Sequence, residues 1–195
     1  GTHSVVGGGS LNQAAATWTV IGGGRENWAT KAYDTVGGGY FNTASGQHSA
    51  VSGGTYNTAS GQSSTIPGGA YNTADGDYGF AAGRRAKALH NGSFVLADST
   101  DSNFASVRDD SLRARFNGGL TFQVNDGYWF RVWMNSGRVL EASNGAHLTT
   151  GGSWVNGCRR ASKENFTPLD GADLLDRLAA RPGLRGRGGL GGGAP

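Results

Sequence analysis

Apolar and polar positions recur along the first half of the chain with a period of fifteen residues. An apolar, mostly β-branched position returns once in each period, and an alanine follows it eight positions later. The first column holds Val6, Ile21, Val36, Val51 and Ile66, and the second holds Ala14, Ala29, Ala44, Ala59 and Ala74. A polar column of Asn12, Asn27, Asn42, Asn57 and Asn72 runs beside them, as does a glycine column of Gly8, Gly23, Gly38, Gly53, Gly68 and Gly83. A register this regular over five units predicts a solenoid.

The length of the period favours coils of β-sheet over helical repeats. Fifteen residues are too few for a pair of helices, and glycine pairs in each unit would break a helix. Two strands of about five residues, joined by turns at the glycines, would fill one coil, and successive coils would pair in parallel about 4.8 Å apart. The Val/Ile and alanine columns should then face each other across a thin interior, with the asparagine amides stacked as a hydrogen-bonded ladder. The predicted class is all-β, without helix between residues 4 and 83.

So thin a coil predicts a lateral partner. Each coil buries few apolar groups against the entropy cost of ordering fifteen residues. Three copies around an axis would bury a second face of every coil, and we therefore expect a homotrimer. The 36 glycines and the 16% of charged residues also suit a repeat architecture better than an ordinary packed core.

The repeats are similar to those of a known family. The units SAVSGGTYNTASGQ and STIPGGAYNTADGD, followed by YGFAAGRRAKALHNGSFVLADS, resemble the left-handed parallel β-roll of YadA-like heads in trimeric autotransporter adhesins and related bacterial or phage fibre proteins. The resemblance covers residues 1 to about 100. It implies a homotrimer that is displayed outside the cell or on a virion and touches its target with its lateral surface. The first two units depart from the pattern, because Ala16 and Lys31 stand where the later units have Gly46, Gly61 and Gly76.

A different β region is expected after residue 90, where the fifteen-residue register is lost. The segments FVLADS, LRARFNGGLTFQV and GYWFRVWM indicate antiparallel or interlocked strands, and residues 135–137 suit a hairpin. In the last segment Trp129, Arg131 and Trp133 share one face of the strand. They form either an exposed platform that binds sugar rings or a receptor protein, or part of a surface that is buried within a trimer. Large side chains on both faces favour burial.

The stretch from Gly152 to Pro182 resembles the start of the endosialidase-type intramolecular chaperone of trimeric tail fibres and spikes. That family cleaves itself at a serine followed by aspartate, with an activating lysine five residues beyond the serine. Lys163 matches the lysine, whereas Cys158 holds the place of the serine and Arg159 that of the aspartate. The long helical body is also missing, since only about three helical turns fit before Pro182. We therefore expect no cleavage, with Cys158 a lone free thiol, although a thiol is a competent nucleophile once ionised.

The remaining chemistry points away from catalysis. The four histidines are far apart and show no ligand spacing, so neither a metal nor another cofactor is expected. The formal charge of +3 arises in residues 176–195, which argues against a nucleic-acid partner. The basic collar, defined as Arg84, Arg85, Lys87 and His90, should cap the roll or meet acids such as Asp98 and Asp101. No apolar run is long enough to insert into a membrane.

These observations predict four regions and a non-enzymatic function. The regions are a roll over residues 1–90, a strand and hairpin region over 91–157, a chaperone remnant with a short helix over 158–182, and a Gly/Arg-rich tail over 183–195. The expected protein is a structural or adhesive subunit of a trimeric, extracellular bacterial surface fibre that meets a host glycan or matrix protein. The alternative is a phage tail-fibre or tailspike segment that recognises a host polysaccharide, and a third hypothesis is a self-cleaving module. Residues 1–9 should expose an unpaired strand edge, which would permit filaments through end-to-end assembly.

Overall fold

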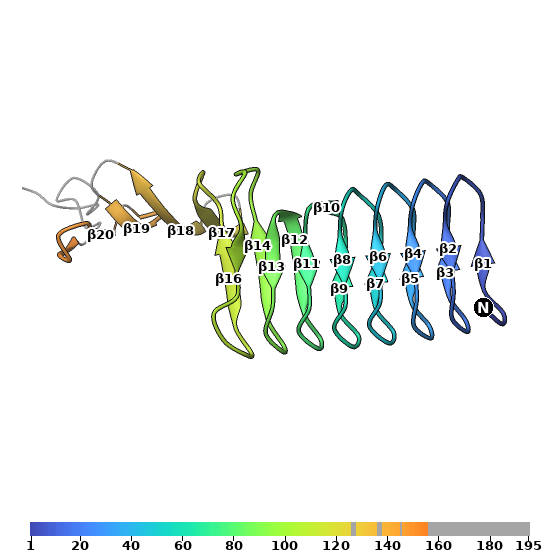
Figure 1. Cartoon of the computed structure of the whole chain (residues 1–195). Coiled ribbons are helices and arrows are strands. Elements are labelled where there is room, and N and C mark those ends of the chain that lie inside the picture. The colour runs from blue at the N-terminus through green and yellow to red at the C-terminus, as the bar shows by residue number, and fades with distance from the viewer. Residues whose placement is uncertain (126–127, 136–137, 145, 156–195) are drawn as a thin grey trace, which may run out of the picture. The chain divides into compact units, whose positions relative to one another are not determined.

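The computed structural model describes residues 1–125, 128–135, 138–144 and 146–155. The chain divides into two units, Gly1–Leu120 and Thr121–Pro195, which are described separately. The first unit is a parallel β-solenoid whose coils follow one another in a row (Figure 1). The described ranges contain no helix, and therefore none long and apolar enough to cross a membrane.

Two parallel sheets form the walls of the solenoid. Sheet A has the order β1-β3-β5-β7-β9-β12-β14-β16, with β10 also paired to β12, and sheet B has the order β15-β13-β11-β8-β6-β4-β2. The strands of sheet A are β1 (Val5–Val6), β3 (Val20–Ile21), β5 (Thr35–Val36), β7 (Ala50–Val51), β9 (Thr65–Ile66), β10 (Gly69–Ala70), β12 (Phe80–Arg84), β14 (Phe94–Ala97) and β16 (Leu112–Arg115). Those of sheet B are β2 (Gln13–Ala14), β4 (Trp28–Ala29), β6 (Thr43–Ala44), β8 (Thr58–Ala59), β11 (Thr73–Ala74), β13 (Ala86–Ala88) and β15 (Phe104–Ala105).

The interior holds the apolar columns that the period predicts. Val51 pairs with Ile66 in sheet A and Ala59 with Ala74 in sheet B, and all four side chains are fully buried. Val6 departs from the expected inward row, because it remains 44% exposed. Its strand β1 pairs with only one neighbour in this chain, β3, so no second coil covers it.

The asparagine column forms a ladder through the interior. The Asn42 amide nitrogen Nδ2 donates to the carbonyl oxygens of Gly38 and Gly54, both at 2.9 Å. Its Oδ1 accepts the backbone N–H of Asn57 at 3.1 Å, and Asn57 repeats this contact with Asn72 at 3.0 Å. Each buried amide therefore satisfies backbone groups in its own coil and in the next one, which explains how fully buried polar residues are accommodated.

The coils bend differently from the prediction. The repeat strands are two residues long instead of about five, because non-glycine residues in the left-handed region interrupt them. In one coil, His48 has a φ of 62° and Tyr56 has a φ of 55°, in addition to Gly54 at 94°. Hydrogen bonds between coils hold these bends: Tyr56 N–H donates to the Tyr40 carbonyl at 3.0 Å, and His48 N–H donates to the Ala32 carbonyl at 3.2 Å. Left-handed φ angles are uncommon for bulky residues, so residue type alone does not predict these bends.

The solenoid continues past the boundary predicted at residue 90. Phe80 pairs in parallel with Phe94, fourteen residues on, and Phe94 pairs in parallel with Leu112, eighteen residues on. FVLADS and the start of LRARF were expected to form antiparallel or interlocked strands, and the antiparallel alternative was wrong because both segments pair in parallel. Parallel pairing requires matched positions within the strands, whereas the connecting loops can differ in length, so a lost sequence period does not end the solenoid.

The Phe104 ring and the guanidinium groups of Arg113 and Arg115 cover the interior at the last coil. Arg113 takes the position opposite the buried Val95, and its guanidinium lies 4.5 Å from the centroid of the Phe104 ring. The Arg115 guanidinium lies 5.0 Å from the same ring, and its Nε donates to Asp98 Oδ1 at 3.0 Å. The pKa of Asp98 is held well below its usual range, first by the backbone N–H of Asn117 and then by Thr100. This cluster ends the hydrophobic interior.

The second unit contains a separate sheet, sheet C, with the order β17-β18-β19-β20-β21. Its strands are β17 (Leu120–Asn125), β18 (Tyr128–Asn135), β19 (Arg138–Ala142), β20 (His147–Thr149) and β21 (Trp154–Val155). The pairs from β18 to β21 are antiparallel, and Asn135 pairs with Arg138, as expected for a hairpin over residues 135–137. The predicted helix within 158–182 and the tail over 183–195 lie outside the described residues.

Candidate ligand-binding surface

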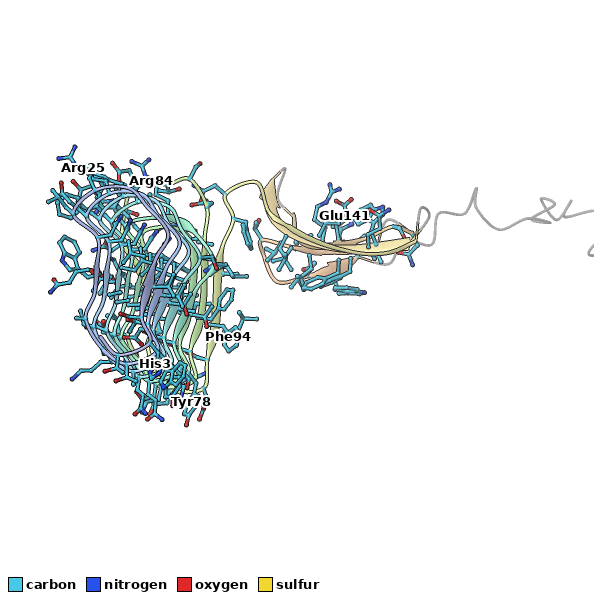
Figure 2. The ribbon with its side chains drawn as sticks, turned by 90° about the vertical axis from the view of Figure 1, so that its right-hand side faces the viewer. His3, Arg25, Tyr78, Arg84, Phe94 and Glu141 are labelled. Carbon is cyan, nitrogen blue, oxygen red and sulfur yellow. The ribbon has the colours of Figure 1, made fainter. Side chains whose placement is uncertain are left out.

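Two columns of aromatic rings run along the solenoid at its left-handed bends. The first, the edge ring column, contains the residue at the same left-handed bend as His48 in each successive coil. It consists of His3, Trp18, Tyr33, His48, Ser63 and Tyr78, and beyond Tyr78 the same bend continues without rings at Gly92 and Asp110. Figure 2 shows His3 and Tyr78, the first and last rings of this column, at the same edge of the solenoid, with Arg25 and Arg84 at the opposite edge.

The rings of the edge ring column stack in pairs. The His3 and Trp18 ring centroids lie 4.2 Å apart with planes 8° from parallel, and those of Tyr33 and His48 lie 4.8 Å apart with planes 2° from parallel. Tyr78 stands alone and is 63% exposed. Stacking across coils supports the bends at His3, Trp18, Tyr33 and His48, and leaves ring edges and some ring faces exposed.

The second column, the tyrosine row, consists of Phe41, Tyr56 and Tyr71. Successive ring centroids lie 5.1 and 5.2 Å apart, with nearly parallel planes. The Arg85 guanidinium ends the row 5.1 Å from the centroid of the Tyr71 ring. The hydrogen bond with Tyr40 raises the pKa of Tyr56. The inner ring faces of this row are therefore covered by neighbouring rings.

The side chains of the basic collar make ion pairs and hydrogen bonds with other residues of the solenoid. Arg84 and Arg85 both contact Asp101, the first at 3.1 Å, and the hydrogen bond from Arg85 lowers the pKa of Asp101. The expected contact between the collar and Asp101 is thus present, whereas Asp98 pairs with Arg115 instead. Lys87 Nζ donates to the Tyr71 carbonyl and to Thr73 Oγ1, both at 2.8 Å, and burial lowers the pKa of this lysine.

His90 completes the collar through an interior contact. Its Nδ1 lies 2.7 Å from Ser106 Oγ, and the backbone N–H groups of Leu89 and His90 both donate to that hydroxyl. The collar therefore joins neighbouring coils, and its charges are engaged by the protein itself.

The predicted aromatic platform lies on β18. The Arg131 guanidinium is 4.7 Å from the centroid of the Trp129 ring, and its Nε donates to Thr121 Oγ1 at 3.1 Å. On the other face of the strand, Phe130 and Val132 are 41% and 37% exposed in the single chain. The side chain of Trp133 lies outside the described residues, as do Cys158 and Lys163.

The outer face of sheet A carries a continuous uncharged column. Its members are joined by the strand register, in which Ala50 pairs with Thr65 and Thr65 with Phe80. The whole column consists of Val5, Val20, Thr35, Ala50, Thr65, Phe80, Phe94 and Leu112. The Phe80 and Phe94 rings stack at 5.3 Å, and Leu112 is 71% exposed. This column is an uncharged, mostly apolar surface that runs along the solenoid.

Neither ring column was predicted from the sequence. The signal was the same fifteen-residue spacing, but residue types vary along these columns, so identity alone did not reveal them. The part of the chain that the structure describes contains no group of three His, Cys, Asp or Glu side chains able to hold a metal ion. The chain matches no protein-family model and no curated protein. The fold itself therefore gives the class, an all-β parallel β-solenoid.

Proposed function

We propose that this chain is a non-enzymatic structural and adhesive subunit of a trimeric, extracellular bacterial surface fibre. The observation that supports this most is the uncharged outer column of sheet A, which spans the solenoid from Val5 to Leu112. The likeness of its repeats to the heads of trimeric autotransporter adhesins supports the same proposal. Under it, three chains pack their sheet A faces around a common axis.

The two outer faces of the solenoid differ in a way that selects one of them for packing. The outer column of sheet B is more polar, because it contains an amide and a charged side chain beside two apolar residues. Its members in register are Gln13, Trp28, Thr43, Thr58, Thr73, Lys87 and Ala105. The outer column of sheet A contains only apolar residues and threonine. Because charged and amide side chains lose hydration when they are buried, sheet A is the face that can be covered at lower cost.

The remaining chemistry suits a rod that displays side chains. Arg84 and Arg85 of the collar pair with Asp101, and Arg115 at the end of the solenoid pairs with Asp98. Repeated bends instead present rings along two edges, and a trimer would display each column three times. Repetition of weak contacts on one rigid particle raises avidity, which is the requirement of an adhesive fibre.

A matched pair of substitutions tests the proposal. Ala50 and Thr58 are both half-buried, but Ala50 lies on the outer face of sheet A and Thr58 on that of sheet B. We expect Ala50→Glu to reduce the assembly to a 20.0 kDa chain in sedimentation equilibrium, and Thr58→Glu to leave a trimer. Binding to a glycan and matrix-protein array should weaken in step with the loss of trimer. A wild-type monomer, or equal effects of both variants, would contradict the proposed packing.

A further inference from the structure

The edge ring column has a single break at Ser63. All six of its members have a φ between 54° and 65°, so their Cα–Cβ bonds leave the backbone in the same direction. Five members are aromatic, and Ser63 is the sixth. The coil-to-coil hydrogen bonds continue across the break, since Ser63 N–H donates to the Gln47 carbonyl at 2.9 Å and Tyr78 N–H to the Gln62 carbonyl at 2.8 Å. The backbone of the column is thus intact, and only a ring is missing.

The missing ring leaves space between two ring-bearing coils. Neighbouring coils lie about 4.8 Å apart, so the coils of His48 and Tyr78 are separated by about 9.6 Å. A flat ring in contact with a ring on each side would occupy about 7–8 Å, because carbon atoms make contact at about 3.5–4 Å. The puckered ring of a pyranose is thicker than a flat ring and fills this interval better.

Polar groups border the break. Gln47 and Gln62 directly precede His48 and Ser63, and both are exposed. Asp77 precedes Tyr78, and its Oδ1 accepts the backbone N–H of Gln62 at 2.8 Å, which fixes this carboxylate beside the break. Amide groups donate and accept hydrogen bonds and a carboxylate accepts them, which matches the mixed requirements of sugar hydroxyl groups.

The geometry points to a binding site for one pyranose ring of a surface glycan at this break. The C–H faces of the sugar contact the electron-rich ring faces of His48 and Tyr78, and its hydroxyl groups reach Gln62 and Asp77. This inference rests on the proposed adhesive function and names the class of ligand. The tyrosine row lacks such an opening, because its rings cover one another.

The column itself supplies a test that keeps the fold. Ser63→Tyr fills the break with a residue that Tyr33 and Tyr78 already place in the same backbone conformation. The probes are methyl glucopyranoside, methyl galactopyranoside and methyl mannopyranoside. Their binding to the full chain is measured by saturation-transfer NMR. At least one of them should bind with a Kd of about 1 mM, a reasonable strength for so small a ligand. We expect Ser63→Tyr to weaken that binding at least tenfold, and Ser63→Ala to retain it.

The outcomes separate this site from the proposed function. Equal binding to wild type and to Ser63→Tyr, or no binding of any pyranoside, overturns the site, even if the fibre still adheres through other surfaces. Binding of phenol without binding of a pyranoside overturns the assignment to sugars. Pyranoside binding that is sensitive to Ser63→Tyr supports the site, even if the chain proves monomeric and the trimeric fibre is rejected.

Discussion

Replacing Asn57 by alanine should destabilise the solenoid more than any change to its exposed faces. The Asn57 side chain makes four hydrogen bonds from a fully buried position. Its Nδ2 donates to the carbonyls of Gly53 and Gly69, and its Oδ1 accepts both the backbone N–H and the Nδ2 of Asn72. Alanine removes all four bonds and leaves a small cavity between coils.

The cost follows from the groups that lose a partner. The buried backbone N–H of Asn72 is left unsatisfied, which costs about 1–3 kcal/mol. The two bonds to carbonyl groups contribute about 0.5–1.5 kcal/mol each, although the Gly69 carbonyl keeps the N–H of Thr55 at 3.1 Å. Asn72 Nδ2 also keeps the carbonyls of Gly68 and Gly83. We therefore expect a loss of about 3 kcal/mol in the free energy of unfolding, a large share of the about 5–15 kcal/mol of an ordinary domain.

Urea unfolding followed by circular dichroism gives the loss of stability, and hydrogen exchange gives its location. The backbone N–H of Asn72 should lose protection more than the amides of coils further away. Thr58→Ala is the matched control, since Thr58 is the next residue and lies half-buried on the outer face of sheet B; it should cost at most about 1 kcal/mol. An Asn57→Ala loss below about 0.5 kcal/mol, with unchanged protection at Asn72, would refute the ladder as a source of stability.

Two further predictions concern backbone conformation and pH. Gly54→Ala should destabilise the solenoid by several kcal/mol, because Gly54 has a φ of 94° and an added Cβ would lie 2.1 Å from the Gly69 carbonyl oxygen. Gly53→Ala is the control and should be tolerated, because its Cβ would meet no atom closer than 3.9 Å. Urea unfolding of both variants gives the comparison. Burial raises the pKa of Asp34 above 3.8, so its contribution to stability is present at acidic pH and is lost as the pH rises through the raised value. Asp34→Ser places at position 34 the residue that Ser49 provides in the next coil. As the pH rises from 3 to 7, this variant should gain stability relative to wild type, by about 1.4 kcal/mol for each unit by which the pKa of Asp34 is raised. A stability difference that stays constant across this pH range would contradict the raised pKa of Asp34.

The periodic half of the fold was predictable because each coil repeats the same contacts. The buried column of Val51 holds only valine or isoleucine from Ile21 to Ile66, and that of Ala59 holds only alanine. Asn57 has to satisfy the same backbone groups as the asparagines of the other coils. These constraints keep residue types constant, so the interior can be recognised from spacing alone. The all-β solenoid followed from this periodicity.

The bends and the last coils were less predictable, since their constraints act on the backbone. Left-handed bends at Tyr56 and His48 are fixed by hydrogen bonds between main-chain groups, which many residue types can make. For the same reason Ser63 can replace a ring without disturbing the coil. The strands that begin at Phe94 and Leu112 keep parallel register while their loops change length, so the sequence period disappears before the solenoid ends.

The proposed packing of three sheet A faces around one axis can be measured directly by pulsed electron paramagnetic resonance. Spin labels would be attached to Ala50→Cys and, separately, to Thr58→Cys, each in a Cys158→Ser background so that the one native thiol is removed. We expect a shorter distance between labels on different chains at position 50 than at position 58, because in the proposed trimer sheet A faces the axis and sheet B faces away from it. Absence of any interaction between labels at position 50, or a shorter distance at position 58, would contradict the proposed packing.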